Sequence, residues 1–164
     1  MAAESKVRNA VFCGLAAVTL ALLAGSLSSS WRAIARGLNA TAEQPARISV
    51  AVPQTAGLGA TLMVSVKAFR KPAGGHVGGI VRLKRPGVAS GVVVGRFSIM
   101  PAESFTAASS ADEKRYQFDI SAAVNELRVS GGEAEVEVAL FDRAGGPTPI
   151  GAELTVGTAR ITTR

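Results

Sequence analysis

The segment over residues 115–121 reads RYQFDIS and carries the clearest β-strand pattern in the chain. Tyr116, Phe118 and Ile120 alternate with polar residues, so their apolar side chains share one face of a strand. Six further segments of this type are separated by Gly- and Pro-containing turns: 46–52, 60–69, 76–84, 91–100, 133–143 and 153–161. This spacing predicts a mainly β domain over residues 46–164, an antiparallel β-sandwich of about seven strands or a barrel, with a short helix at 122–127.

Three details of the strands extend this prediction. In the segment 60–69, the apolar face is predicted to hold Leu62, Val64, Val66 and Ala68. The segment 153–161 changes phase at Gly157, which predicts a β-bulge there. In the segment 76–84, Gly78 and Gly79 allow a bulge or the close approach of a neighbouring group.

Charge is divided unevenly along the domain. Eight basic and no acidic residues lie within 47–96, whereas residues 97–164 hold ten acidic and six basic ones. Such an asymmetry can attract an acidic partner or anionic lipid headgroups, and it is also what ordinary outward-facing strand and turn residues produce. The predicted partner-binding basic patch consists of Arg70, Lys71, Arg82, Lys84 and Arg85.

Other charged residues point to simpler roles. Glu133, Glu135 and Glu137 alternate with apolar residues and are interpreted as a solvated stripe on one strand. Nucleic-acid binding is not expected, because few aromatic residues accompany the basic ones.

A stretch without any charge precedes the domain. Residues 10–27 read AVFCGLAAVTLALLAGSL, and eighteen helical residues span roughly 27 Å, close to the ~30 Å hydrocarbon core of a bilayer. A tryptophan and an arginine follow, as is typical of a membrane boundary. We therefore predict a short basic tail over 1–9 and one transmembrane helix over 10–30. The predicted anchor residues are Ala10, Phe12, Leu15, Leu20, Leu23, Leu27, Trp31 and Arg32.

A cleaved signal peptide is the alternative interpretation of this stretch. Lys6 and Arg8 form a basic start, and Ala24-Gly25-Ser26 would permit cleavage before Leu27. The apolar run exceeds the usual core of about 7–15 residues, which favours an uncleaved anchor. Residues 31–45 are predicted to form an interfacial helix and a linker. The expected location is a bacterial inner membrane, with the C-terminal domain in the periplasm.

The residues offer little for catalysis. His76 is the only histidine and Cys13, inside the apolar stretch, is the only cysteine. One imidazole in a Gly-rich loop cannot assemble a metal site, and no nucleophile-elbow pattern accompanies any serine. We expect no disulfide in the domain, no cofactor and no enzymatic activity; an enzyme would need His76 or a pair of carboxylates to be essential.

Three segments in order resemble the C-terminal β-domain of polyphenol oxidases and related tyrosinases: GRFSIMPAESF (95–105), RYQFDISAAVNEL (115–127) and EAEVEVALFDRAGGPTPIGAELTVGTARI (133–161). Upstream, ATLMVSVKAFRKPAGGHVGGIVRLKRPG (60–87) would correspond to the opening strands of that domain. The Lys-Phe-Asp-Val signature of the plant domain has no counterpart; Ile80-Val81-Arg82-Leu83 stands in its place. The family's activity resides in a separate helical domain with six copper-binding histidines, so no catalytic or metal residue carries over. The resemblance implies a sandwich that, in the family, packs over the active-site face of a copper enzyme. Because the domain is separated from that enzyme here and is expected to be tied to a membrane, we expect it to dock on another polypeptide.

Two non-catalytic functions follow as expectations. The first is a membrane-anchored accessory subunit whose sandwich docks on a larger protein; the resemblance suggests a tyrosinase-like copper oxidase. The second is a structural subunit of a multi-protein membrane complex, whose anchor packs on other transmembrane helices. Small residues that suit close helix contact are Ala16, Ala17, Ala21, Ala24 and Gly25.

Overall fold

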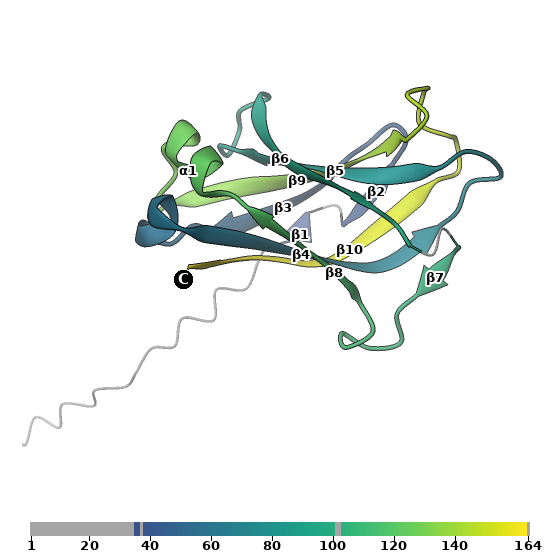
Figure 1. The fold of residues 1–164 in the computed structure, drawn as a ribbon, viewed down its shortest axis with the longest axis horizontal. Coiled ribbons are helices and arrows are strands. Elements are labelled where there is room, and N and C mark those ends of the chain that lie inside the picture. Colours follow the sequence, from purple (N-terminus) through teal and green to yellow (C-terminus); the bar gives the residue numbers. More distant parts are fainter. Residues whose placement is uncertain (1–34, 37, 101–102, 164) are drawn as a thin grey trace, which may run out of the picture. The chain divides into compact units, whose positions relative to one another are not determined.

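The computed structural model describes residues 35–36, 38–100 and 103–163. These residues form ten β-strands, one α-helix and one 3-10 helix, η1 (Figure 1). The elements are β1 (Ala35–Arg36), β2 (Asn39–Thr41), β3 (Ala46–Ala51), η1 (Gln54–Leu58), β4 (Ala60–Arg70), β5 (Val77–Lys84), β6 (Gly91–Ser98), β7 (Phe105–Thr106), β8 (Lys114–Asp119), α1 (Ser121–Leu127), β9 (Glu133–Asp142) and β10 (Glu153–Thr163).

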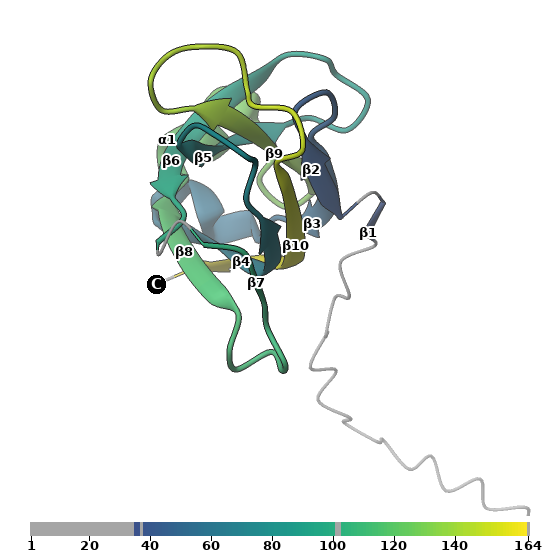
Figure 2. The same ribbon diagram turned by 90° about the vertical axis from the view of Figure 1, so that its right-hand side faces the viewer.

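The strands form two antiparallel sheets, which lie one over the other when viewed as in Figure 2. Sheet A has the order β1-β3-β9-β5-β6. Sheet B has the order β2-β10-β4-β7, and β8 also pairs with β4. One apolar core joins the two inner faces, with Ile48 and Leu83 from sheet A and Leu62 and Leu154 from sheet B at most 1% exposed. The predicted mainly β fold with two antiparallel layers is confirmed.

Each of the seven predicted strands is present. The alternation is regular in β3 and β8, whereas β5 is buried along nearly its whole length. Ile48 and Val50 of β3 are buried between the exposed Arg47 and Ser49. In β8 the residues Tyr116 and Phe118 pack against the core. Alternation in an antiparallel sheet reflects one buried and one solvated face. The sequence of such a segment therefore suffices to predict which of its side chains are buried.

Two irregularities adjust the predicted faces. Val156 of β10 pairs with Val66, and the next pair is Ala159 with Val64, which confirms the change of phase predicted at Gly157. A second register shift leaves Lys67 of β4 without an opposite residue. Beyond it Phe69, only 4% exposed, occupies the core position that had been predicted for Ala68. A bulge inserts one residue and so exchanges the two faces of a strand.

The start of the domain differs from the prediction. Ala35–Arg36 and Asn39–Thr41 are strands, paired with β3 and β10 respectively, and not an interfacial helix followed by a linker. The sheet edges supply hydrogen-bond partners to these short segments, and such tertiary pairing overrides a weak helical periodicity. Within the described residues the domain therefore begins at residue 35 instead of 46. A further short strand, β7, lies between β6 and β8 and pairs with β4.

The predicted tail, the anchor at 10–30, Trp31 and Arg32 lie outside the described residues. No helix in the part of the chain that the structure describes has the length and apolar character needed to cross a membrane.

Candidate docking surfaces of the sandwich

A charge cluster lies on the outer face of sheet A, where β3, β9 and β5 are neighbours. The register places Glu137 of β9 between Arg47 of β3 and Arg82 of β5. Carboxylate oxygens of Glu137 lie 3.4 Å from Arg47 Nε, 3.3 Å from Arg82 Nη1 and 2.9 Å from Lys84 Nζ. A second carboxylate, Glu135, lies 3.7 Å from Lys84 Nζ. Three cations thus surround one carboxylate, which serves sheet A as an internal cross-link.

The two central side chains of this cluster are shielded from water, whereas Arg47 and Arg82 at its edges are 53% and 35% exposed. The side chain of Lys84 is 5% exposed and that of Glu137 is 10% exposed. Burial acts to raise the pKa of Glu137, but the hydrogen bond and charge of Lys84, with the charges of Arg47 and Arg82, outweigh it and hold the pKa below its usual value. The prediction of a solvated glutamate stripe is therefore wrong at Glu137. The sequence of one strand shows which residues share a face. It does not show which residues of the neighbouring strands lie beside them.

The predicted basic patch is not one surface. Arg70 is the last residue of β4 and Lys71 follows it. Lys84 and Arg85 stand in the same way at the end of β5, a strand that runs back in the opposite sheet. Seven residue steps along β5 separate these ends by roughly 23 Å. Arg82 and Lys84 belong to the charge cluster described above.

The basic residues of the first half also meet acidic residues of the second half. Arg70 Nη2 lies 2.9 Å from Glu153 Oε2, and Lys71 Nζ lies 3.0 Å from Glu103 Oε1. With Arg47, Arg82 and Lys84, five of the eight basic residues in 47–96 are paired in this way. Most of the basic residues in 47–96 therefore form ion pairs within the domain itself.

Four loops meet at one end of the sandwich, which we call the loop end: residues 42–45, 71–76, 143–152 and, in the fourth loop, 99–100 and 103–104. Lys71 joins two of them, because its backbone N–H donates to Ser104 Oγ at 2.9 Å. The backbone N–H of Arg143 donates to the carbonyl of His76 at 2.8 Å. At Gly75 an added Cβ would lie 2.7 Å from Pro149 Cγ, so these two loops are in contact.

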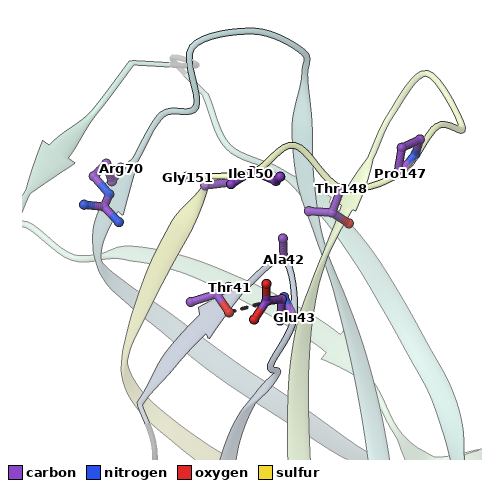
Figure 3. Close-up of a pocket in the computed structure, with 9 residues that line it drawn as sticks. Thr41, Ala42, Glu43, Arg70, Pro147, Thr148, Ile150 and Gly151 are labelled. Carbon is purple, nitrogen blue, oxygen red and sulfur yellow. Dashed lines mark hydrogen bonds between the residues drawn. The ribbon is translucent and has the colours of Figure 1, made fainter.

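A pocket of about 470 Å³ opens at the loop end (Figure 3). Thr41, Glu43 and Arg70 line it together with residues of the loop before β10. Thr41 Oγ1 accepts hydrogen bonds from the backbone N–H groups of Glu43 and Gln44, which holds the first loop in a tight turn. Charged, polar and apolar residues thus line the same shallow pocket.

Two large apolar side chains at the loop end are exposed to solvent. Ile150, at the pocket, is 92% exposed, and Met100 on a neighbouring loop is 66% exposed. Sequence reasoning missed this surface because its loops are distant in the chain. The single signal was their Gly- and Pro-rich composition, which predicts loops but not which loops lie together.

Groups with possible chemistry were also located. His76 is exposed in the loop 71–76, and the described residues contain no group of three or more His, Cys, Asp or Glu side chains placed to hold a metal ion. Ser65, 3% exposed, donates a hydrogen bond to Glu113 and accepts one from the backbone N–H of Thr158 at 2.8 Å. This polar set lies beside the β10 bulge and satisfies the groups that the bulge leaves unpaired.

The comparisons with known proteins give structural matches but no match in sequence. No family model matches the chain, and no curated protein matches it in sequence. The solved structure of recombinantly expressed latent aurone synthase, a polyphenol oxidase, matches 77% of this chain at 18% identity with a TM-score of 0.43. The enzyme from its natural source matches 79% at 16% identity with a TM-score of 0.44. This chain spans about a quarter of each of those chains (25%), and both are of the family that its sequence resembles.

Proposed function

We propose that this chain is a non-catalytic accessory subunit, held at a bacterial inner membrane by residues 10–30, whose periplasmic sandwich docks on a larger partner protein through its loop end. The partner class that the sequence resemblance suggests is a tyrosinase-like copper oxidase. The observation that carries the proposal is the exposure of Ile150 and Met100 on loops that are fastened to one another.

The energetic reason lies in preorganisation. Ordering loops on binding costs free energy, and at the loop end the backbone contacts of Lys71, His76 and Arg143 have already joined them. Anchoring apolar side chains beside a pocket, with charged groups at the rim, is the usual anatomy of a protein interface. Here Arg70 and Glu43 supply that rim around Ile150.

Replacement of Ile150 or Met100 by aspartate is expected to weaken partner binding about tenfold or more, or about 1.4 kcal/mol. The full chain would be extracted in mild detergent, its co-purifying protein identified by mass spectrometry, and the dissociation constant measured with that purified protein. Leu58→Asp is a matched control, because Leu58 is 91% exposed at the opposite end of the sandwich. Equal binding by Ile150→Asp, Met100→Asp and wild type would show that the loop end is not the docking surface.

The second candidate, a structural subunit of a membrane complex, is favoured by the small residues of the apolar stretch. Changing Ala17, Ala21 and Gly25 together to leucine is expected to release such a subunit from its complex, because close helix contact needs small side chains. Native gel electrophoresis of detergent extracts measures this. Docking through the loop end predicts the converse: the leucine variant stays bound and Ile150→Asp is released.

A further inference from the structure

A second surface lies at the other end of the sandwich, which we call the helix end: η1, α1 and the turn at 85–90. These three parts lie at the same end of the sandwich (Figure 1), and two hydrogen bonds join them. Asn125 Nδ2 of α1 donates to the carbonyl of Gly57 in η1 at 2.9 Å. Arg85 Nε of the turn donates to the carbonyl of Leu127 in α1 at 2.5 Å. α1 therefore bridges η1 and the turn.

The helix end also presents apolar side chains to solvent. Leu58, the last residue of η1, is 91% exposed, and Val88 in the turn is 43% exposed. The backbone N–H of Val88 donates to the carbonyl of Arg85 at 3.1 Å, so this side chain sits on a closed turn. The exposed charges nearby are two basic and three acidic residues, a net of −1: Arg85, Arg128, Asp119, Glu126 and Glu133. A contact made by this end would therefore depend on apolar insertion more than on net charge.

The direction of β1 determines from which side the chain enters the domain. β1 is antiparallel to β3, with Ala35 opposite Ile48 and Arg36 opposite Arg47. β3 runs from the loop end at Ala46 toward the helix end at Ala51, since Ala51 pairs with the first residue of β9. β1 consequently runs from the helix end toward the loop end, and the backbone enters it from the helix-end side.

The length of chain before β1 is short. Four residues, 31–34, separate the predicted end of the anchor at residue 30 from β1, and an extended chain of that length spans at most about 14 Å. From Ile48 to Ala51 the sandwich continues only about 10 Å farther toward the helix end. The ten residues of β9 cover about 30 Å between the two ends. The chain thus enters the sandwich on the side of its helix end, four residues after the predicted end of the anchor.

From these observations we infer that the helix end rests on the lipid headgroup region, with Leu58 and Val88 inserted into it. This inference rests on the proposed function, because it requires residues 10–30 to be held in the membrane. It adds a direction to that function: lipid contacts one end of the sandwich, and the partner protein contacts the other.

Site-specific quenching tests the inference on the full chain. In a Cys13→Ala background, Leu58→Cys and, separately, Ile150→Cys would carry a fluorescent label; the two native side chains are 91% and 92% exposed, so the sites are matched. The proteins would be reconstituted into phosphatidylcholine–phosphatidylglycerol vesicles in which some headgroups bear a nitroxide. We expect several-fold stronger quenching at position 58 than at position 150, and position 88 should follow position 58.

The outcomes separate this inference from the proposed function. One test is a wash of the vesicles with alkaline carbonate, which removes proteins that are not held in the membrane. If the chain stays in the vesicles after this wash but quenching at position 58 equals or falls below that at position 150, the helix end does not face lipid, and the proposal of an anchored subunit still stands. If carbonate washes the chain from the vesicles, the anchor and the inference both fail. Leu58→Asp serves as a further check: it should reduce quenching at a label on position 88 without lowering the unfolding midpoint.

Discussion

Glu137→Ala is expected to destabilise the sandwich by about 3 kcal/mol, because it leaves the buried Lys84 ammonium without its 2.9 Å partner. Glu135 stays within 3.7 Å of that ammonium, so the loss should lie at the lower end of the range for a broken buried pair. Arg47 and Arg82 would also lose their shared carboxylate. The measurement is the urea unfolding midpoint of the full chain in mild detergent.

Two controls separate burial from charge. Glu103→Ala removes a carboxylate that is 71% exposed and 3.0 Å from Lys71, and it should change the free energy of unfolding by no more than about 0.5 kcal/mol. Replacing Lys84 and Glu137 together by methionine should recover most of the stability, since no buried charge is then left unpaired. A loss in Glu137→Ala no larger than that in Glu103→Ala would contradict the structural role of the cluster.

The same residue makes stability depend on pH. Burial raises the pKa of Glu137, yet Lys84, Arg47 and Arg82 lower it more, so its folded pKa lies below the unfolded one. The stabilisation is therefore complete above about pH 4.3, the ordinary glutamate pKa, and is lost as pH falls through the folded pKa. Glu137→Gln is expected to flatten the fall in unfolding midpoint below that pH. An acid profile as steep as that of the wild type would assign the effect to other carboxyl groups.

Gly79→Val is expected to destabilise the domain by about 3 kcal/mol through overpacking. A Cβ at Gly79 would lie 2.1 Å from Cζ of Phe97, whose side chain is only 6% exposed. The Phe97 ring cannot withdraw easily, because it stacks on Tyr116 with 4.1 Å between ring centroids. The close approach that the glycine pair predicted is thus an aromatic ring lying across the backbone of β5.

Thermal or urea unfolding of the Gly79 variants checks this. Gly74→Val is the matched control, because no atom lies within 4 Å of a Cβ at Gly74, and it should change stability by less than about 1 kcal/mol. Adding Phe97→Leu to Gly79→Val should return part of the loss, since the two side chains compete for one space. Should Gly79→Val unfold at the wild-type midpoint, the ring must have another position available.

What the sequence determined by itself is local. Alternation with period two located the seven principal strands and the buried faces of segments such as the one around Tyr116 and Phe118, because a pleated strand separates its two faces without outside help. The change of phase at Gly157 likewise predicted the bulge that β10 has there. The domain resemblance depended on the same order of strands. The function, the anchor and the location remain predictions that need the experiments above.

Only the tertiary structure decided what depends on pairing between distant segments. The short strands β1, β2 and β7 have no pattern of their own and exist because a sheet edge supplies their hydrogen bonds. Sequence alternation does not specify register, and register brought Glu137, one residue of the expected solvated stripe, between three cations where it is buried. Because of the strand topology, the residues of the predicted basic patch lie at two ends of the sandwich. Met100 and Ile150, distant in the sequence, lie at the same end. The physical reason is common to all: strand faces arise from neighbouring residues, whereas register and loop proximity arise from contacts across the whole chain.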